Sequence, residues 1–337
     1  MHYPKISILV PTYNEEKHIE KCLKSLLNQT YKGEFEIIVI DGKSTDNTTK
    51  IVNELCKFSS KIILLTNPLK IQSSGRNIGI NYSNSEYIAY LDAHSYIEPN
   101  WLEQLWSTFH TLTQIDKMLA GVGSVYEDAN HTSFTRSLSR AYRSILIGSS
   151  SKSFLNKQEV TKVDNGYGFL YKKNTLIEAG LYDESLKTAE DIELNFRLSY
   201  KLGFNLYIEP KAIAYYYFKE KPKDVFSQQF RYGFWRIQAM KKLGIYNLKV
   251  FIPGIAIIIL FIIIATTSHF NELRLMAIAF GLYLITIVFS SVYESIKFKI
   301  NFFYFLINII SIQFGYGCGV LIGIFYAIFK KKDKLIQ

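Results

Sequence analysis

The chain has 337 residues, is 48% hydrophobic and 20% charged, and carries a formal net charge of +10. This length allows one large domain or two smaller ones, each with a core of ordinary size. The three cysteines, Cys22, Cys56 and Cys318, are isolated in the sequence, which argues against a zinc site or a disulfide framework and agrees with a reducing compartment.

The positive charge is concentrated just before the first long apolar run. The residues concerned are Lys219, Lys221, Lys223, Arg231, Arg236, Lys241, Lys242 and Lys249. The short polar stretch at residues 268–274 holds only one basic residue, Arg274. This asymmetry is typical of a cytoplasmic face that meets acidic headgroups, so membrane lipids are expected partners. The sequence shows no nucleic-acid reader motif, and no nucleic-acid partner is expected.

The N-terminal part alternates between strand-like and helix-like patterns. Short apolar runs bounded by turn residues predict strands at 5–11, 35–41, 61–68 and 86–93, and helical periodicity or capping residues predict helices at 15–29, 44–55 and 75–83. Repeated strand-helix units predict an α/β fold with a mostly parallel sheet covered on both faces. Residues 1–16 do not resemble a signal peptide, so the first 249 residues are expected to stay in the cytoplasm.

Polar side chains collect where the predicted strands end. Residues 12–15 follow the first strand, Asp41 ends the second, and Asp92 and His94 follow the fourth. Ligands of parallel sheets bind outside the carboxyl ends of the strands, so these three groups predict a binding site. Each residue taken alone could equally form a turn or a helix cap.

A further acidic pair begins a predicted helix at residues 190–202. Leu194, Leu198 and Leu202 recur at helical spacing, and Glu190 and Asp191 fall in the first turn. One explanation for the pair is an ordinary cap that complements the helix dipole. The alternative is a catalytic role, which depends on the resemblance described next.

Five stretches together resemble glycosyltransferase family 2, the inverting enzymes of GT-A fold. They are SILVPTYNEEKHIEKCLKSLLNQTY, EIIVIDGKSTDNT, GRNIGI followed by YIAYLDAH, AGLYDESLKTAEDIELNFRL, and QQFRYGFWR. The match covers roughly the first 240 residues in the family's usual order. The DAH triplet and the QFRYG ending are also similar to the exopolysaccharide glucosyltransferases of the succinoglycan type. The resemblance implies a Rossmann-like, mostly parallel GT-A domain and a nucleotide-sugar donor.

The resemblance assigns the donor site to residues Pro11, Tyr13, Glu15, Asp41, Arg76 and Asn77. Among these, Asp41 would contact the base and Tyr13 would lie against it. A uracil ring suits a π-face and a carboxylate acceptor for its imide N–H, which supports part of this assignment. Tyr13 could otherwise be an ordinary rim residue.

Asp92 and His94 stand where the family carries its DxD metal motif, and Asp92 also belongs to the predicted donor site. A divalent cation there, Mn²⁺ or Mg²⁺, would neutralise the charge of a sugar diphosphate. Imidazole suits Mn²⁺ better than Mg²⁺, which prefers oxygen ligands. We expect Asp92 to be the principal ligand and His94 to bind the metal or the diphosphate, although His94 could instead cap the turn or pack.

In the family, the second acid of the ED pair is the catalytic base, which makes Asp191 the expected base and Glu190 its neighbour in the site. The base would deprotonate an acceptor hydroxyl as it attacks the anomeric carbon opposite the nucleotide. One in-line displacement inverts the configuration. General-base help is typically worth on the order of 100- to 10,000-fold in rate.

The stretch at residues 228–236 is a near match to the family's QxxRW signature, with Tyr232 where tryptophan is usual. By resemblance Gln228 belongs to the donor site, and Arg231 or Arg236 would pair with the diphosphate. The alternative is a basic amphipathic helix on the membrane surface, within a juxtamembrane segment at about 219–249. Both roles are compatible if the acceptor is lipid-linked.

Three apolar runs predict a membrane region at residues 250–330. The first two, at about 250–267 and 275–293, are long enough to cross a bilayer as helices. A full third span at 302–329 would place the basic tail at 331–337 outside, against the positive-inside rule. We therefore expect this glycine-interrupted segment to be partly interfacial or re-entrant, with the C-terminus inside.

The combined prediction is a multi-pass, metal-dependent, inverting hexosyltransferase of the cell membrane with its catalytic domain in the cytoplasm. Its donor would be a nucleotide sugar, with UDP as the expected nucleotide, and its acceptor a lipid-linked saccharide in cell-surface glycan assembly. One alternative is a polyprenyl-phosphate sugar synthase, whose phosphate acceptor needs little base catalysis. Another is a non-catalytic membrane scaffold, which the retained acids Asp41, Asp92 and Asp191 argue against.

Overall fold

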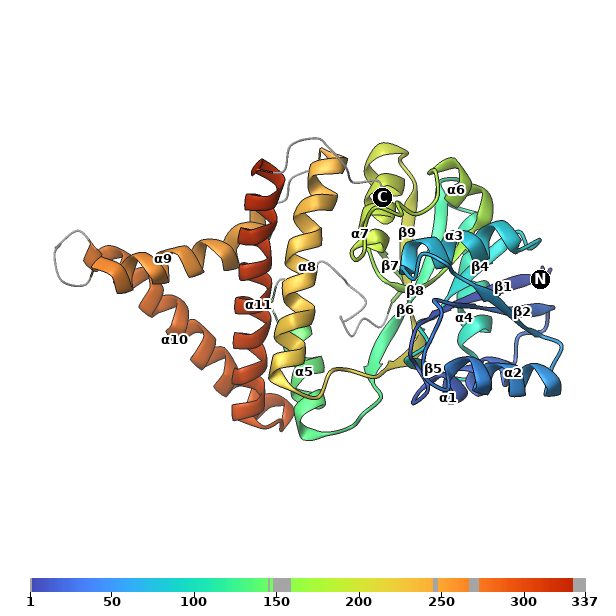
Figure 1. Cartoon of the computed structure of the whole chain (residues 1–337), viewed down its shortest axis with the longest axis horizontal. Coiled ribbons are helices and arrows are strands. Elements are labelled where there is room, and N and C mark those ends of the chain that lie inside the picture. Colours follow the sequence, from blue (N-terminus) through green and yellow to red (C-terminus); the bar gives the residue numbers. More distant parts are fainter. Residues whose placement is uncertain (1, 145, 148–158, 245–247, 267–272, 330–337) are drawn as a thin grey trace. The chain divides into compact units, whose positions relative to one another are not determined.

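The computed structural model describes residues 2–144, 146–147, 159–244, 248–266 and 273–329. Two compact units make up the chain, one from residues 1–129 and 150–217, the other from residues 130–149 and 218–337. In the described residues the first unit is a sheet with helices, and the second is helical (Figure 1). The basic tail at 331–337 and the loop residues 268–272, both discussed from the sequence, lie outside the described residues.

Four parallel strands form one half of the sheet, in the order β3-β2-β1-β4. Each is an apolar run, and a helix follows each of β1, β2 and β3 and returns the chain so that the next strand runs in the same direction. The strands are β1 Ile6–Thr12, β2 Phe35–Asp41, β3 Ile62–Thr66 and β4 Tyr87–Tyr90, and the helices are α1 Ile19–Leu27, α2 Thr48–Phe58 and α3 Gln72–Tyr82. The predicted alternation of strands and helices is confirmed here.

The other half of the sheet mixes both directions. The strand β8 pairs antiparallel with β4 and with β6, β6 pairs parallel with β9, and β5 and β7 pair antiparallel with β9. These strands are β5 Ser95–Ile97, β6 Leu119–Asp128, β7 Thr161–Val163, β8 Tyr167–Lys172 and β9 Asn205–Tyr216. The sheet is therefore parallel over its first four strands and mixed beyond them.

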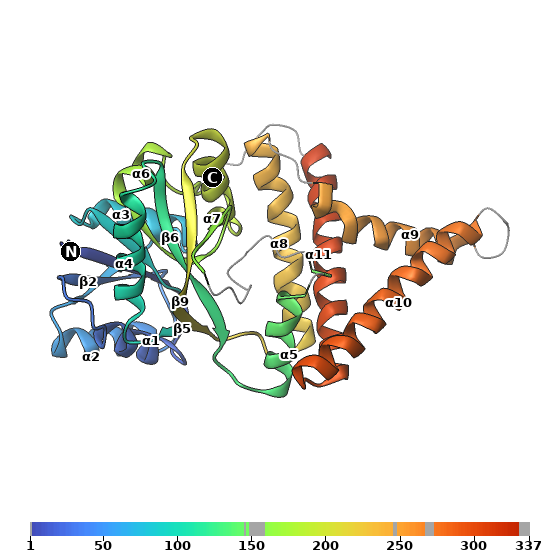
Figure 2. The ribbon, with the colours of Figure 1, turned by 180° about the vertical axis from the view of Figure 1, so that it is seen from behind.

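Helices cover both faces of the sheet. Successive side chains of β1 point to opposite faces and so contribute to two separate cores. Ile6, Ile8 and Val10 point into one core with α1 and with α4, Trp101–Thr113. Leu9 points into the other core with α3 and with the helices α6, Lys173–Glu178, and α7, Glu190–Phe196. A π-helical turn, Arg197–Lys201, continues α7. Figure 2 shows these two helical layers from behind.

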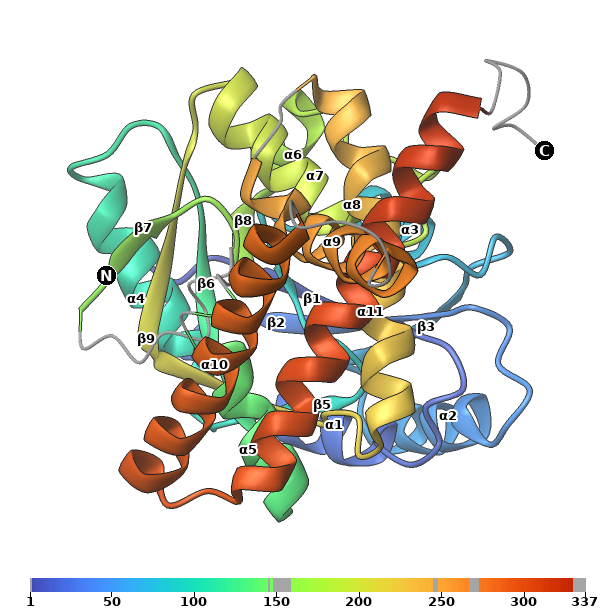
Figure 3. The same cartoon turned by 90° about the vertical axis from the view of Figure 1, so that its left-hand side faces the viewer.

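In the described residues the second unit consists of helices, which Figure 3 shows after a turn of 90° from Figure 1. They are α5 Ser133–Tyr142, α8 Pro222–Leu243, α9 Ile252–Thr266, α10 Leu273–Phe298 and α11 Phe302–Phe329, with a short 3₁₀ turn at Leu248–Phe251. The predicted juxtamembrane segment thus contains a 22-residue helix, α8. Pro222 at its first position and Gly244 after its end, with φ of 68°, are the residues expected at the two ends of a helix.

The third apolar segment is one continuous helix of 28 residues, α11. Its glycines do not interrupt it, because they lie where α8 and α9 approach so closely that a Cβ would clash. The glycine-containing segment is therefore helical throughout. By length and composition alone, two helices of the described part could cross a membrane, α10 over Phe280–Phe298 and α11, whereas α9 has only 15 residues.

Candidate functional site

A pocket opens at the carboxyl ends of β1, β2 and β4, where the sequence predicted a site. We call it the strand-end pocket, and its volume is about 170 Å³. Its lining residues are Pro11, Thr12, Tyr13, Glu15, Ile40, Gly42, Asn67, Lys70, Ile71, Gln72, Asp92, Ala93 and His94. The three polar groups that follow separate strands in the sequence therefore do converge on one edge of the sheet.

Tyr13 and Asp41, the two residues expected at a nucleotide base, differ in their surroundings. Tyr13 is 47% exposed and forms part of the pocket wall. Asp41 is buried, and its carboxylate accepts hydrogen bonds from the Ser44 amide at 3.0 Å and the Ser44 hydroxyl at 2.6 Å. Its chain neighbours Ile40 and Gly42 line the pocket. Asp41 thus shapes the turn after β2 directly behind the pocket.

His94 is held by a carboxylate on one side and a phenol on the other. Its Nδ1 atom lies 2.8 Å from Oε1 of Glu15, and its Nε2 atom lies 2.9 Å from the hydroxyl of Tyr216. Glu15 follows β1 and Tyr216 ends β9, so the imidazole links two distant parts of the sheet. Both ring nitrogens are engaged in this arrangement.

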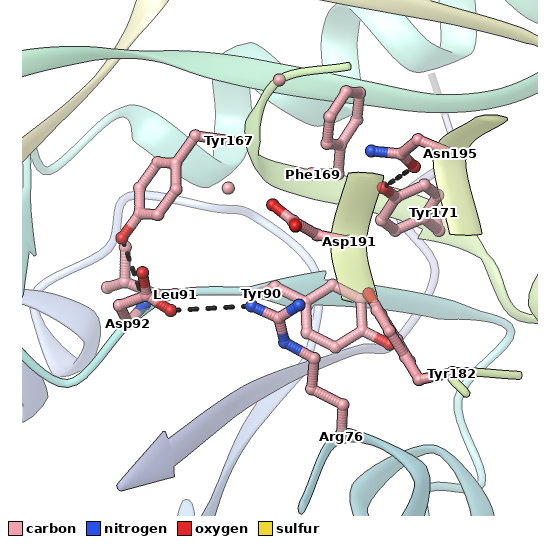
Figure 4. Close-up of a pocket in the computed structure, with 12 residues that line it drawn as sticks. Arg76, Tyr90, Leu91, Asp92, Tyr167, Phe169, Tyr171, Tyr182, Asp191 and Asn195 are labelled. Atoms are coloured by element: carbon pink, nitrogen blue, oxygen red, sulfur yellow. Dashed lines mark hydrogen bonds and ion pairs between the residues drawn. The ribbon is translucent and has the colours of Figure 1, made fainter. Parts of the chain in front are cut away.

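A second, smaller pocket lies beside the first and shares Asp92 with it. We call it the inner pocket, and its volume is about 30 Å³. Its lining residues are Arg76, Tyr90, Leu91, Asp92, Gly166, Tyr167, Gly168, Phe169, Tyr171, Tyr182, Asp191 and Asn195. Figure 4 shows the Asp191 carboxylate pointing into this pocket, among aromatic rings and across from the Arg76 guanidinium. The expected base and the expected metal ligand therefore line the same pocket.

The guanidinium of Arg76 connects the acids of the inner pocket. It lies 3.1 Å from the Glu190 carboxylate and 3.7 Å from the Asp92 carboxylate (Figure 4 shows the second pair). The rings of Tyr90 and Tyr182 lie 5.4 Å and 5.1 Å from its central carbon. A buried cation among three acids lowers the cost of burying their charge, which is the main electrostatic feature of the site.

Burial dominates the protonation of the acidic pair on α7. It raises the pKa of Glu190 to about 7, against the opposing effect of Arg76, and Asp191 raises it further. Burial also raises the pKa of Asp191, and Arg76 again opposes the rise. A carboxyl with a raised pKa is a stronger base near neutral pH than an exposed one. Raised pKa values of this kind are common among active-site acids.

The backbone that presents this pair is unusual. Ala189, just before α7, has φ of 65° and ψ of 19°, the left-handed region that non-glycine residues seldom adopt. This bend directs the first turn of α7 toward the pocket, where Glu190 contacts Arg76 and Asp191 accepts a hydrogen bond from the Ile192 amide at 2.7 Å. Strain of this kind persists only where the surrounding structure enforces it.

The remaining predicted donor residues have other contacts. The Asn77 side chain exchanges two 2.9 Å hydrogen bonds with the backbone of Tyr182 and donates a third to Glu184 at 2.9 Å, so it holds the loop that carries Tyr182. Gln228, Arg231 and Arg236 lie on α8 in the second unit. There Arg231 is exposed, Arg236 is 4% exposed, and Gln228 donates to the Tyr232 hydroxyl at 3.3 Å.

Several site residues were not found from the sequence. Gln72 donates to the Asp92 carboxylate at 2.9 Å, and its position one helical turn before Arg76 was the available signal. Tyr167 accepts a hydrogen bond from the Asp92 amide at 3.1 Å. The amide of Asn195 bonds the Tyr171 hydroxyl at 2.6 Å and Asn165 at 2.7 Å. Asn195 lies within one of the motif stretches, one helical turn after Asp191, and that spacing was the available signal. Tyr167 and Tyr216 lie outside the motifs, so no local pattern indicates them.

The predicted metal ligands fit a divalent cation to different degrees. The described residues contain no group of three or more His, Cys, Asp and Glu side chains placed to hold a metal ion. Asp92 offers a carboxylate shared by both pockets, the oxygen ligand that Mg²⁺ and Mn²⁺ favour. His94 could join it only by giving up its bond to Glu15 or to Tyr216. A metal at Asp92 would therefore take most of its ligands from the substrate and water.

The fold is that of the GT-A glycosyltransferases. One solved structure, the mannosyltransferase PcManGT from Pyrobaculum calidifontis in complex with GDP-Man and Mn²⁺, aligns over 92% of this chain and 87% of that chain. The TM-score is 0.63 at 14% sequence identity, so the likeness concerns the fold.

The sequence comparisons then identify the family. The family model described as glycosyl transferase family 2 matches residues 7–178, which is 172 of 337 residues, and the chain belongs to this family and is a glycosyltransferase. Among curated proteins it is 32% identical to the dolichyl N-acetyl-alpha-D-glucosaminyl phosphate 3-beta-D-2,3-diacetamido-2,3-dideoxy-beta-D-glucuronosyltransferase of Methanococcus voltae, over 77% of this chain and 81% of that protein. It is 27% identical to the succinoglycan biosynthesis protein ExoA of Rhizobium meliloti (strain 1021), over 67% of each.

Proposed function

We propose that this glycosyltransferase moves a hexose from a UDP-sugar to a lipid-linked saccharide, with inversion and with a divalent metal. The observation that carries the proposal is that Asp92 and Asp191, the expected metal ligand and the expected base, line one pocket with Arg76. The name of the Methanococcus voltae relative specifies a dolichyl-phosphate-linked sugar acceptor, and that of ExoA a polysaccharide pathway. Both names support an acceptor in glycan assembly.

In this proposal the strand-end pocket holds the nucleotide. Tyr13 offers an exposed ring against which a base can stack, and Asp41 stands behind the pocket wall. Glu15 orients His94 at the pocket rim. A divalent cation bound at Asp92 would neutralise the charge of the diphosphate leaving group. Lys70, also in the lining, adds a positive charge that suits the same phosphates.

The inner pocket holds the reacting atoms. An acceptor hydroxyl gives its proton to the Asp191 carboxylate as its oxygen forms a bond to the anomeric carbon, and the bond from that carbon to the nucleotide diphosphate breaks. Arg76 keeps the acids ionised and in place by pairing with Glu190 and Asp92. The aromatic walls exclude water, which would otherwise compete as acceptor.

A polyprenyl-phosphate sugar synthase would use the same donor site but a phosphate acceptor. That acceptor needs little base catalysis, whereas here a buried carboxyl of raised pKa lines the pocket. We therefore propose a hydroxyl acceptor. Membrane association of the whole chain, with the first unit in the cytoplasm, is part of the proposal and is supported by the apolar helices α10 and α11.

The proposal is tested by a donor screen with the full-length protein in membranes. Release of the nucleotide from several UDP- and GDP-sugars is measured with Mn²⁺, Mg²⁺ or a chelator, with lipid-linked saccharides and polyprenyl phosphate as separate acceptors. Asp191→Asn should lower turnover by at least about 100-fold while donor binding is kept, since only the base is lost. Glu54→Gln, an exposed acid on α2, is the matched control and should behave as the parent.

Two outcomes would contradict the proposal. If Asp191→Asn turned over a donor as fast as the parent protein, Asp191 would not be the base. If polyprenyl phosphate were glycosylated and no saccharide acceptor were, the enzyme would be a sugar-phosphate synthase instead.

A further inference from the structure

One face of α11 is packed against α8 along most of the latter's length. A Cβ on Gly315, Gly319 or Gly323 would come within 3 Å of the backbone of Phe226, Phe230 or Phe234 respectively. The two helices therefore run in the same direction, with their backbones in contact. Gln238 and Lys241 on α8 extend the contact by donating to the carbonyls of Gly323 at 3.0 Å and Ala327 at 2.6 Å.

The first half of α11 is packed against α5 through polar groups. Asn308 is fully buried and donates to the Phe134 carbonyl at 3.2 Å, and Gln313 donates to the Leu146 carbonyl at 2.7 Å. The Ser137 hydroxyl on α5 bonds the Asn301 carbonyl at 3.4 Å, just before α11 begins. Both halves of α11 are thus covered by other elements of the second unit.

The helices that cover α11 are charged. The helix α8 carries Lys223, Asp224, Arg231, Arg236, Lys241 and Lys242, and α5 carries Arg136 and Arg140. Charged side chains are costly in the hydrocarbon core of a bilayer. If α11 stood across a membrane, α8 and α5 would enter the hydrocarbon with it.

The opposite face of α11 is an exposed apolar stripe. Its members lie toward the two ends of the helix, and they include Phe303, Ile307, Ile310, Ile322, Phe325 and Phe329. Residues 311–321 between them are buried or half-buried, and α9 meets this middle part of α11. Phe303 is 74% exposed and Phe329 is 67% exposed, so the stripe is fully open at both ends. A helix with one apolar stripe and one covered polar face suits the boundary between water and lipid.

The helices α9 and α10 have a different orientation within the same unit. The first turns of α9 meet the middle of α11, where Gly317 lies against Pro253 and Ile257 and Gly254 lies against Leu321. From there α9 leaves across the direction of α11 in Figure 1 and is seen nearly end-on in Figure 3. The two helices cannot both stand along a membrane normal.

The helix α10 returns toward the start of α11 and bears a broad exposed apolar face, with Ile285 at 64%, Phe289 at 73% and Ile296 at 75% exposure. Its last turns hold the charges. Glu294 pairs with Arg140 at 2.5 Å and 3.1 Å, and Arg140 lies over the Phe298 ring. The last turns of α10, which form the base of the hairpin of α9 and α10, therefore carry an ion pair. Beyond these turns the hairpin is apolar along its length.

We propose that α11 lies in the plane of the membrane surface, with its exposed stripe on the lipid and α5 and α8 on the cytoplasmic side. The hairpin of α9 and α10 is then the part that crosses the bilayer. The basic residues at its base, such as Lys297 and Lys299, meet anionic headgroups. This inference concerns membrane topology, and it does not depend on which sugar or acceptor the enzyme uses.

Cysteine accessibility tests the proposal in the full-length chain. In a background with Cys22, Cys56 and Cys318 replaced by alanine, single cysteines are placed at both ends of α11, Phe303→Cys and Phe329→Cys, and at the far end of the hairpin, Arg274→Cys. A membrane-impermeant maleimide added to intact cells should label only Arg274→Cys. After permeabilisation all three should be labelled. Labelling of one end of α11 from outside would overturn the in-plane orientation, and failure to label Arg274→Cys would overturn the crossing hairpin.

Depth measurements distinguish an α11 that lies in the membrane plane from one that crosses the bilayer, and they do not depend on the side from which a label is added. Nitroxide labels at Phe303, Ile322 and Phe329 should give the same shallow depth in vesicles. Labels at Ile278, Ile285, Phe289 and Ile296 on α10 are the matched series and should pass through the bilayer centre. A profile along α11 that passes through the bilayer centre would refute the proposal. Neither readout uses transferase activity, so an error in the proposed function leaves this test intact.

Discussion

At the scale of single residues, the site is organised by one buried cation. Arg76 reaches Glu190 on α7 and Asp92 after β4, which are 98 positions apart in the sequence. Gln72 supports the same Asp92 oxygen from one helical turn earlier. A carboxylate held from two sides keeps a fixed position, which a metal ligand requires. The side chains around Asp92 therefore have testable roles.

Metal dependence should distinguish Asp92 from His94. Asp92→Asn removes the charge of the proposed ligand, whose carboxylate lines both pockets, so the Mn²⁺ concentration for half-maximal activity should rise by at least about 100-fold. His94→Gln should raise it by only about 10-fold, the range of groups that orient a site from outside it. The measurement is a metal titration of donor turnover in membranes.

Tyr216→Phe is the matched control for His94, because it removes the hydroxyl that engages Nε2 and keeps the ring. If His94 were a direct ligand, releasing Nε2 should lower the Mn²⁺ requirement. An Asp92→Asn protein with an unchanged metal requirement would show that the cation binds elsewhere.

The pH dependence of transfer should reflect the acidic pair. Burial raises the pKa of Glu190 to about 7 and also raises that of Asp191, and because the two groups interact, the rate should report pKa values of the pair. The base works unprotonated, so turnover should rise with pH over the range in which the pair loses its protons. We call this rising part of the pH profile the acid limb.

Arg76 lowers the pKa of both acids, so Arg76→Gln should move the acid limb to higher pH as well as reduce the maximal rate. Arg136→Gln, an exposed arginine on α5, should leave the limb in place. The profile is measured from about pH 5 to about pH 9. A limb that stays where it was or moves to lower pH in Arg76→Gln would contradict this assignment.

At the scale of elements, the close approach of α8 and α11 depends on residues without side chains. A Cβ at position 319 would lie 2.1 Å from the Phe230 carbonyl oxygen, and one at 233 would lie 2.2 Å from that of Tyr316. Backbone atoms cannot move aside as a flexible side chain can. The sequence pattern suggested interruption at these glycines, yet in the folded chain they are the contact surface of a continuous helix.

Gly319→Leu should therefore separate α8 from α11 and destabilise the second unit. The loss of unfolding free energy should exceed the roughly 1–3 kcal/mol that is typical of overpacking in cores. Gly281→Leu on α10 is the matched control, because a Cβ there meets no atom within 4 Å. Thermal unfolding in detergent, followed by fluorescence-detected size exclusion, measures the difference. Equal midpoints for the two variants would show that the helices do not depend on this contact.

At the scale of the whole molecule, the boundary between the units does not follow the chain. Residues 130–149 leave the first unit and join the helices of the second, and the chain then returns. Phe134, Leu138 and Ala141 on α5 are buried there, with Asn308 of α11 bonded to the Phe134 carbonyl. Both pockets, in contrast, are lined entirely by residues of the first unit.

A chain that ends at Tyr217 should therefore aggregate, because it exposes the apolar face of α5. Replacing residues 130–149 in that truncated chain with a flexible glycine-serine linker should give a soluble protein that still binds a nucleotide-sugar donor. Size exclusion and calorimetric titration with UDP-sugars measure the two properties. If the truncated chain were monomeric with α5 intact, the burial of α5 in the second unit would not matter for its solubility.

The sequence by itself determined the elements whose signals are local. The strands β1 to β4 and the helices between them follow from apolar runs and their turn residues, and Asp92 and Asp191 follow from motifs within a few positions. Local periodicity does not show which residues meet across the sheet. For that reason the mixed pairing of β6, β8 and β9 was not foreseen, although the sheet's parallel half was.

Only the tertiary structure decided the contacts that join distant parts of the chain. It pairs His94 with Tyr216, 122 positions away, brings Arg76 to Glu190, and joins the glycines of α11 to the backbone of α8. The physical reason is the range of the interactions: helical and strand periodicity is set by neighbours within about four residues, whereas ion pairs and close packing form only once the folded sheet and helices bring their partners within a few ångströms.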